Sequence, residues 1–216
     1  GTPILSEIEF AARYTDARMI AITGSNGKTT TTSLIYHLLR LAGEDVGLAG
    51  NIGHSLALQV AESPHSTYVI ELSSFQLDNM YDFRAHIAVL LNITPDHLDR
   101  YDFCMQNYVE SKMRITQNQQ STDTFIYWSE DEYVPSELAK HPDAAQLCGF
   151  TDAPQVGSAG YAEGDSFVIQ RPVPFRMPLS ELSLPGRHNL RNALAAAMVA
   201  LAAGVPAEVV RQGLSD

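Results

Sequence analysis

The sequence predicts an α/β fold in which a mostly parallel sheet is flanked by helices. Uniformly apolar runs of strand length alternate with helical segments through the first half of the chain, which is typical of strands covered on both faces. A glycine-containing loop joins the first of these runs to a helix. The 216 residues are enough for one large α/β domain or two small ones. A smaller, irregular β-rich part is expected near residues 145–185, where Gly, Pro and Ser are frequent.

The first half of the chain is predicted to contain two helices and three apolar strands. Residues 6–14 form a short amphipathic helix that Ser6 caps, with Glu9 at the spacing of a capping box. The second helix follows the glycine loop from about Thr29 to Ala42, where Gly43 ends it. The strands are RMIAIT at 18–23, TYVIEL at 67–72 and HIAVLL at 86–91.

The second half is predicted to alternate in the same way before ending in helices. Residues 103–119 form a helix, which Asp102 is placed to cap, and residues 124–128 and 146–150 form strands on either side of a short helix near Ser136. Irregular hairpins are expected over residues 151–185. The alanine-rich stretch 189–203 is a strong helix former, and a short final helix follows the break at Gly204-Val205-Pro206.

Composition excludes several classes of function. The 25 acidic and 14 basic residues give a net charge of −11, which argues against non-specific binding to nucleic acid or to an anionic membrane. It does not exclude an anionic ligand held by backbone amides and a few lysines. The two cysteines are far apart, and neither a signal peptide nor a long apolar run is visible, so we expect a cytosolic protein or a piece of one.

The strongest motif is TGSNGKTT at residues 23–30, placed between an apolar strand and a helix. Its glycines let the backbone turn so that N–H groups point at phosphate oxygens, and the helix N-terminus adds a favourable partial charge. Lys28 is placed to reach the β- and γ-phosphates, and the Thr29 hydroxyl to bind Mg²⁺. Ile22 stands where the Walker pattern has its first glycine, so an ordinary glycine turn is the alternative. The strand–loop–helix context favours a P-loop-type sheet that binds a nucleotide.

Two acidic or histidine-containing segments follow predicted strands, where ligands gather in open α/β sheets. Glu71 ends one strand and is placed to hold a magnesium ion, or is simply a solvated strand-end carboxylate. Residues 92–101, NITPDHLDRY, follow the next strand and bring His97 close in sequence to Asp and Arg residues. This segment is interpreted as a metal and phosphate site, with a polar capping loop as the alternative.

Lys112 lies on the apolar stripe of its helix, four residues after Tyr108 and three before Ile115. A lysine there either extends along the apolar surface to reach solvent or has a specific purpose, such as conversion to a carbamate that binds metal. Asn189 and Asn192 open the alanine-rich helix and share one face. Their amides suit an adenine edge, although Asn189 capping the helix is the alternative.

These pieces occur together, in this order, in the Mur ligases and the related folylpolyglutamate synthases. The chain resembles the central domain of that family over essentially its whole length, including the shortened glycine spacing of the phosphate loop. The resemblance implies that Glu71 and His97 bind metal, that Lys112 is the lysine carbamylated in several members, and that Asn51 lies near the γ-phosphate and the substrate carboxylate. The implied nucleotide-binding residues are Gly24, Ser25, Asn26, Gly27, Lys28, Thr29, Thr30, Asn51, Asn189 and Asn192; the implied metal ligands are Thr29, Glu71, His97 and Lys112; the implied catalytic residues are Lys28, Glu71, His97 and Lys112.

The string ELSSFQL at 71–77, with NITPDHLDRY, is similar to the members that add D-glutamate to UDP-N-acetylmuramoyl-L-alanine. The resemblance implies an ATP-dependent amide ligation through an acyl phosphate, with two Mg²⁺ ions, small-molecule substrates, no nucleic-acid or membrane partner, and a monomeric cytoplasmic enzyme. Residues 1–16 correspond to the end of a preceding domain and its linker, and 17–216 to the central domain. The flanking domains are missing from the chain, so we expect the fragment alone to bind nucleotide weakly at best and not to ligate.

Three other interpretations compete with this one. A different Mur-type or folylpolyglutamate-type ligase would carry another string after Glu71. A GTPase would need an NKxD segment, which the sequence lacks. A binding module with a dead site would have lost residues that carry the chemistry. The residues that argue against this are all present: Lys28, Thr29, Glu71, His97 and Lys112.

Overall fold

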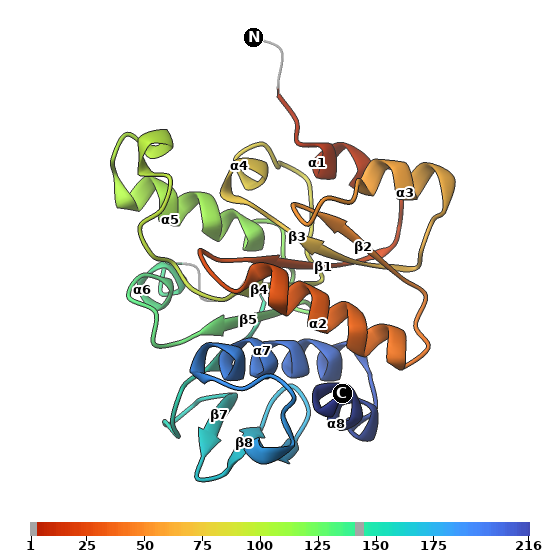
Figure 1. Cartoon of the computed structure of the whole chain (residues 1–216). Coiled ribbons are helices and arrows are strands. Elements are labelled where there is room, and N and C mark those ends of the chain that lie inside the picture. The colour runs from red at the N-terminus through yellow and green to blue at the C-terminus, as the bar shows by residue number, and fades with distance from the viewer. Residues whose placement is uncertain (1–3, 141–144) are drawn as a thin grey trace.

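A computed structural model of the chain describes residues 4–140 and 145–216. It contains one nine-stranded sheet with the strand order β2-β3-β1-β4-β5-β6-β7-β8-β9 (Figure 1). The strands from β2 to β7 in that order run parallel, and β8 pairs antiparallel with both β7 and β9. The prediction of a mostly parallel α/β sheet flanked by helices is therefore confirmed.

The central strands are parallel because each returns through a helical crossover. β1 (Arg18–Thr23) lies between β3 (Thr67–Glu71) and β4 (Ile87–Leu90). The carboxyl ends of these three strands therefore lie at the same edge of the sheet. The remaining parallel strands are β2 (Val46–Gly50), β5 (Thr124–Trp128), β6 (Gln146–Phe150) and β7 (Gly160–Glu163).

Helices cover both faces of the sheet, and each face has its own hydrophobic core. Ile20 and Ile22 of β1 point to the face covered by α2 (Lys28–Leu41), α7 (Arg187–Ala203) and α8 (Ala207–Ser215). Met19 and Ala21 point to the opposite face. That face carries α1 (Glu7–Ala12), α3 (Leu56–Glu62), α4 (Ser74–Leu77), α5 (Met105–Met113) and α6 (Val134–Leu138). The alternation explains why the strand is apolar throughout.

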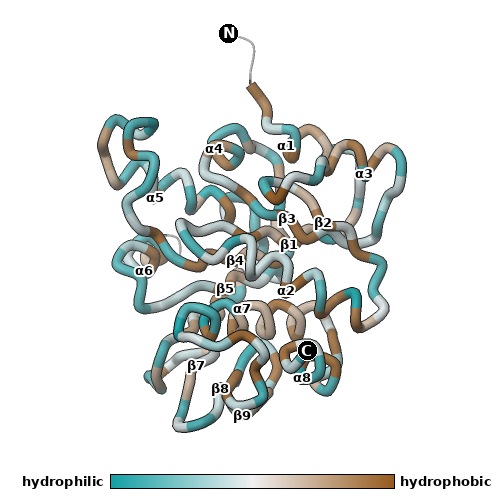
Figure 2. The backbone as a smooth tube through the Cα atoms, viewed as in Figure 1, coloured by the Kyte–Doolittle hydropathy of each residue, from teal (hydrophilic) through white to brown (hydrophobic). Residues whose placement is uncertain are grey.

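α7 is the most buried helix of the fold, because it packs between the sheet and its neighbours α2 and α8. Its residues from 192 to 201 are all buried, and most of the helix is coloured as hydrophobic in Figure 2. Small alanine side chains allow this close approach on every side. Among the described residues, no helix is long and apolar enough to cross a bilayer.

The β-rich part predicted near residues 145–185 extends the main sheet and does not form a separate unit. β6 is still parallel to β5, and the antiparallel hairpins begin with β7, β8 (Ser166–Ile169) and β9 (Phe175–Pro178). β7 and β8 lie at the lower end of the molecule in Figure 1. Short 3-10 turns at Leu98–Tyr101, Arg114–Thr116 and Leu179–Glu181 complete the described elements.

Some element boundaries were predicted wrongly. The helix predicted over 103–119 is α5 followed by a 3-10 turn, and Cys104 occupies its N-cap position, not Asp102. Asp102 has a left-handed backbone with φ of 54°, so it cannot act as that cap. The final alanine-rich helix begins two residues earlier than expected, and Asn189 lies inside its first turn. The strand β2 and the helices α3 and α4 were not predicted.

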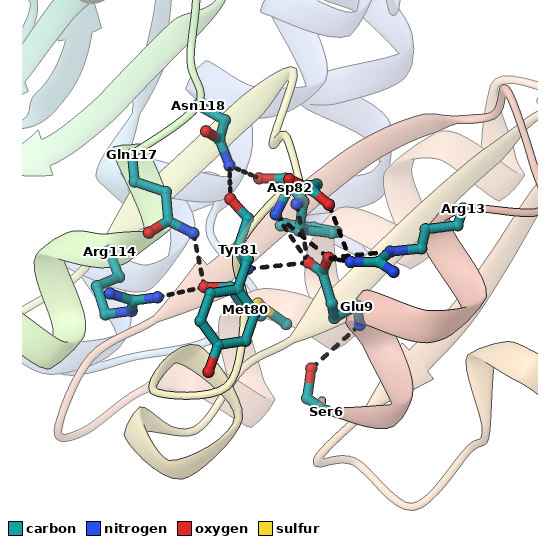
Figure 3. A network of polar contacts seen from close by, with 10 residues as sticks. Ser6, Glu9, Arg13, Met80, Tyr81, Asp82, Arg114, Gln117 and Asn118 are labelled. Atoms are coloured by element: carbon teal, nitrogen blue, oxygen red, sulfur yellow. Dashed lines mark hydrogen bonds and ion pairs between the residues drawn. The ribbon is translucent and has the colours of Figure 1, made fainter. Parts of the chain in front are cut away.

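The capping box predicted at the first helix forms only in part. The Ser6 hydroxyl accepts the Glu9 N–H at 3.1 Å, as expected for a cap. The Glu9 carboxylate is fully buried and turns away from Ser6, accepting N–H groups of residues 81–83 and the Arg13 guanidinium (Figure 3). A tertiary contact has replaced the local one. Residues 1–3 of the predicted leading segment lie outside the described residues.

Candidate functional site

The phosphate-type loop leaves β1 at Thr23 and enters α2 at Lys28. Gly24 has φ of 150° and Gly27 has φ of 84°, a left-handed conformation that strains other residues. Gly27 is the N-cap of α2, and Thr30 is exposed in its first turn. Because β3 and β4 flank β1, the segments that follow both strands border this loop.

Lys28 curls back over the loop that it follows. Its ammonium group donates to the carbonyl oxygens of Gly24 at 2.8 Å and Ser25 at 3.0 Å. Partial burial lowers the pKa of Lys28, and the negative charges of Glu71 and Asp96 oppose that shift. The Lys28 ammonium group therefore lies within the loop of residues 23–28.

A hydrogen-bonded group of three polar side chains lies beside the loop. The Thr29 hydroxyl donates to Glu71 Oε2 at 2.8 Å, and the Asn51 amide donates to Glu71 Oε1 at 2.9 Å. Only 2% of Glu71 is exposed, so its carboxylate is oriented by both partners. The backbone N–H of Asn51 also donates to the Glu71 carbonyl oxygen at 2.9 Å. The structure thus brings together three predicted site residues from α2, the segment after β2, and the end of β3.

Lys112 reaches the same loop from α5 and is buried, with 2% exposure. Its ammonium donates to the Gly24 carbonyl oxygen at 3.0 Å and lies 4.7 Å from the centre of the Tyr108 ring. Burial, reinforced by the charge of Lys28, lowers the pKa of Lys112 to about 7. An amine with that pKa is partly neutral, and hence nucleophilic, at physiological pH. The side chain points inward and does not extend to solvent.

His97 is placed differently from the other predicted metal ligands. Its side chain is 56% exposed, with the ring 5.2 Å from that of Phe75 and Nε2 3.5 Å from Asp96 Oδ2. Its backbone is left-handed, with φ of 48°. Within residues 4–140 and 145–216, no group of three or more His, Cys, Asp or Glu side chains is placed to hold one metal ion. A hydrogen bond joins Thr29 to Glu71, whereas among the described residues no hydrogen bond or ion pair joins His97 to either of them.

The two asparagines of α7 approach the site unequally. Asn192 is 8% exposed, and a Cβ atom added to Gly27 would lie 2.5 Å from its Oδ1 atom. Asn192 therefore closes over the phosphate-type loop. Asn189 lies one turn earlier and donates to the Pro185 carbonyl oxygen at 2.9 Å. Beside them, the Arg191 guanidinium lies 3.9 Å from the Trp128 ring centre and pairs with Asp152.

Several residues that hold the site were given no individual role from the sequence, although two of them lie in the predicted segment 92–101. Asn92 and Thr94 bind the backbone and side chains of Ser25 and Asn26, and the Tyr108 hydroxyl lies 3.2 Å from Ser25 Oγ. The available signal was position, because Asn92 and Thr94 follow β4, the neighbour of β1. Their individual partners depend on strand order, which the sequence alone does not specify.

The sequence profile of the Mur ligase middle domain matches residues 22–200 of the chain. UDP-N-acetylmuramoylalanine–D-glutamate ligase of Bacteroides fragilis is 63% identical over 216 residues, which are 100% of this chain and 49% of the relative. The protein of the same name from Porphyromonas gingivalis is 56% identical, over 99% of this chain and 48% of its own length. The chain thus spans about half the length of these curated relatives.

Solved structures show the same fold at low identity. UDP-N-acetylmuramoyl-L-alanyl-D-glutamate–2,6-diaminopimelate ligase superposes with a TM-score of 0.74 at 22% identity, over 96% of this chain and 48% of its own. MurF from Acinetobacter baumannii gives a TM-score of 0.74 at 23% identity, over 97% of this chain and 48% of its own. Together with the profile match over most of the sequence, the phosphate-type loop and its neighbours show that the chain belongs to the Mur ligase middle-domain family.

Proposed function

We propose that this chain is the nucleotide-binding middle part of an ATP-dependent ligase that adds D-glutamate to UDP-N-acetylmuramoyl-L-alanine. The hydrogen-bonded group of Thr29, Glu71 and Asn51 beside the phosphate-type loop is the observation that carries the ATP-dependent chemistry. The 63% identity to a D-glutamate ligase over the whole chain supports the choice of amino acid. The remaining substrate contacts belong to parts of the relatives that this chain does not cover.

The loop fits the phosphates of a nucleotide. Gly24 and Gly27 have positive φ angles, which let the loop turn so that its N–H groups can face phosphate oxygens. Lys28 supplies a positive charge within the loop. Asn192 closes the loop from α7, and Asn189 one turn earlier is proposed to lie near the adenine. Gly24, Ser25, Asn26, Thr29 and Thr30 complete the proposed nucleotide-binding set.

Mur ligases use ATP with Mg²⁺, and the oxygen donors of Thr29 and Glu71 suit that hard cation. These two residues would hold one ion, and His97 with a carbamate on Lys112 would hold a second. When bound, the metal neutralises phosphate charge and polarises the transferred phosphoryl group. Asn51 orients the Glu71 carboxylate through its amide.

The carbamate on Lys112 would form by addition of its neutral amine to carbon dioxide. The nitrogen lone pair forms the new C–N bond, one C=O π-bond becomes a C–O⁻ bond, and the nitrogen releases a proton to solvent. The lowered pKa of Lys112, about 7, supplies the neutral amine at physiological pH. The product exchanges a buried cation for an anion with two oxygen donors.

Ligation would proceed in two steps. The carboxylate of the acceptor attacks the γ-phosphorus of ATP, forming an acyl phosphate and releasing ADP. The amine of D-glutamate then attacks the acyl carbon, loses a proton, and expels inorganic phosphate. Lys28 neutralises charge on the β- and γ-phosphates during the first step, and the rigid loop keeps the reacting groups aligned.

The division of the chain and its setting are part of the proposal. We place residues 1–16 at the junction with a preceding domain and 17–216 in the middle domain of a monomeric cytoplasmic enzyme. The alternative, another Mur-type or folylpolyglutamate-type ligase, would keep the loop and the Glu71 group while changing the acceptor or amino acid.

Phosphate release by the full-length ligase that contains this chain tests the proposal. With Mg-ATP and UDP-N-acetylmuramoyl-L-alanine, we expect activity with D-glutamate and none with other amino acids. Activity with a different amino acid or acceptor would refute the specificity and retain the ATP chemistry. The 216-residue chain alone should give no ligation above a Lys28→Ala control, and measurable turnover would contradict the division of labour.

A further inference from the structure

We propose that Asn92 is a positioning residue that fixes the phosphate-type loop before nucleotide binds. The claim about loop order stands on geometry alone, whereas its consequence for nucleotide affinity rests on the proposed function. Asn92 lies two residues after the carboxyl end of β4. Because β4 pairs with β1, Asn92 borders the loop that follows β1. Residues 92–101 were predicted to form a metal and phosphate site, but Asn92 itself was given no individual role.

The side chain of Asn92 imitates a peptide group. Its Oδ1 atom accepts the Asn26 N–H at 2.9 Å, and its Nδ2 atom donates to the Asn26 carbonyl oxygen at 3.0 Å. One amide thus pairs with both polar groups of one loop residue, as a neighbouring strand would. A single side chain defines the position and the orientation of Asn26.

These contacts continue the hydrogen bonding of the sheet into the loop. β1 and β4 are in register up to Thr23 and Leu90, and the next bond runs from the Leu91 N–H to the Thr23 carbonyl oxygen at 3.1 Å. The Ser25 N–H then donates to the backbone oxygen of Asn92 at 2.8 Å. The Asn92 side chain adds the following pair, at Asn26. The loop is therefore built as an extension of the β1–β4 ladder.

Two neighbouring contacts strengthen the arrangement. The Ser25 hydroxyl donates to the Thr94 carbonyl oxygen and accepts the Thr94 N–H, both at 2.9 Å. The segment carrying Asn92 is itself anchored, because the Ile93 N–H donates to the buried carboxylate of Asp131 at 2.7 Å. The other Asp131 oxygen accepts the N–H groups of Tyr133 and Val134. Asp131 therefore joins the segment after β4 to the turn before α6.

The contacts divide the amides of the loop into two groups. The N–H groups of Ser25 and Asn26 are committed to Asn92. The hydrogen-bond ladder of α2 begins with the Thr31 N–H donating to the Gly27 oxygen at 2.9 Å. The N–H groups of residues 27–30 precede that ladder, and no acceptor among the described residues pairs with them. Asn92 thus holds the first half of the loop so that the second half presents free donors to a phosphate.

Amide hydrogen exchange of the 216-residue chain tests the ordering directly. Asn92→Ala removes the acceptor of the Asn26 N–H but leaves the backbone acceptor of the Ser25 N–H. We expect exchange at Asn26 to accelerate roughly tenfold, with a smaller change at Ser25. Asn118→Ala is the matched control, because the Asn118 amide also binds two backbone carbonyl oxygens, those of Tyr81 and Phe83, outside the site. It should leave both loop amides unchanged.

Affinity for Mg-ATP, measured by calorimetry on the same variants, tests the consequence. Asn92→Ala should weaken binding roughly tenfold, because the loop must then be ordered on binding, whereas Asn118→Ala should bind as the parent chain does. Asn92→Asp retains the acceptor and loses the donor, so it should keep the Asn26 amide protected and still weaken binding. This variant also serves if Asn92→Ala fails to fold.

The outcomes separate the two proposals. Unchanged exchange at Asn26 in a folded Asn92→Ala chain overturns the positioning role, whatever the affinity. Parent-like Mg-ATP affinity in both Asn92 variants also overturns it, while leaving the nucleotide function intact. A parent chain that does not bind Mg-ATP contradicts nucleotide binding by this part alone, and the exchange at Asn26 still decides whether Asn92 orders the loop.

Discussion

Lys28 and Lys112 donate to the same acceptor, the carbonyl oxygen of Gly24, at 2.8 and 3.0 Å. The two lysines come from different helices and meet at the first glycine of the loop. Two ammonium groups on one oxygen repel each other, and this repulsion adds to burial in lowering the pKa of Lys112 to about 7. The pair concentrates positive charge where the loop is proposed to hold phosphates, at a cost in stability.

Replacing Lys112 should make that cost visible. Because its folded pKa of about 7 is below the ordinary 10.5, the unfolded chain binds more protons between these values, and stability rises with pH across that window. Lys112→Met should raise the free energy of unfolding at pH 6 and flatten the rise between pH 7 and 10. Urea unfolding at several pH values measures both effects. Lys140→Met is the control, because the Lys140 side chain is 54% exposed. If Lys112→Met leaves the pH dependence of stability unchanged, the lowered pKa of Lys112 is contradicted.

Gly27→Ala should destabilise the loop for two separable reasons. Its φ of 84° costs an L-residue about 1–2 kcal/mol, and the new Cβ would lie 2.5 Å from Asn192 Oδ1. Gly43→Ala is a matched control, since Gly43 has φ of 82° with nothing within 4 Å of the added atom. Unfolding free energies should fall more for Gly27→Ala than for Gly43→Ala, and combining it with Asn192→Ala should recover the excess. Equal losses at both glycines would mean that Asn192 does not crowd the loop.

Glu71→Gln should separate metal dependence from folding. The glutamine retains the shape of the side chain but loses its charge. In the parent chain Thr29 and Asn51 both donate to the Glu71 carboxylate, so the NH₂ group of the glutamine would face one of these two donors. We expect nucleotide affinity to lose its dependence on Mg²⁺, with the melting temperature reduced by only a few degrees. Calorimetric titration of ATP with and without Mg²⁺ checks this. Asn51→Ala is the comparison, because it leaves the Glu71 carboxylate in place. A Glu71→Gln variant whose ATP binding still depends on Mg²⁺ would contradict the proposal that Glu71 binds the metal.

Glu9→Gln should weaken the attachment of α1 to the rest of the fold. The buried Glu9 carboxylate accepts N–H groups of Tyr81, Asp82 and Phe83, and a glutamine would face some of them with another donor (Figure 3). The expected loss is about 3 kcal/mol in the free energy of unfolding at pH 7. Glu208→Gln, at an exposed position of α8, should cost almost nothing.

The pH dependence of that loss has a defined sign. Burial alone would raise the pKa of Glu9, but the backbone N–H groups of residues 81–83 and the Arg13 guanidinium bring it below 4.5. A lowered carboxyl pKa contributes stability that is present above pH 4.5 and disappears as the pH falls through the folded value. The difference between the parent chain and Glu9→Gln should therefore shrink at pH 3.5. A difference that stays constant with pH would show that Glu9 does not contribute as a charged group.

Local patterns in the sequence were sufficient for the elements that carry strong periodicity. Uniformly apolar strands such as β1 and β4 were predicted because both faces of a parallel sheet are buried. The loop at residues 23–30 was recognised because glycines, a lysine and a helix start follow one another directly. β2, with the sequence VGLAG, was missed because its two glycines resemble a turn. α3 and α4 were missed because they span only 7 and 4 residues, too short for a clear period.

By itself, the sequence determined the α/β class, the phosphate-type loop, and which polar residues follow strands, since each depends on residues that are close together in the chain. Only the tertiary structure decided which of those residues meet. Strand order places β1 between β3 and β4, so Glu71 reaches Thr29 and Asn92 reaches Asn26. The tertiary structure also decided that the Glu9 carboxylate accepts N–H groups of residues 81–83 in place of the predicted capping-box contact with Ser6, and that the His97 side chain is exposed. Contacts between distant segments depend on how strands are ordered and helices packed, and hydrophobic periodicity carries no information about either.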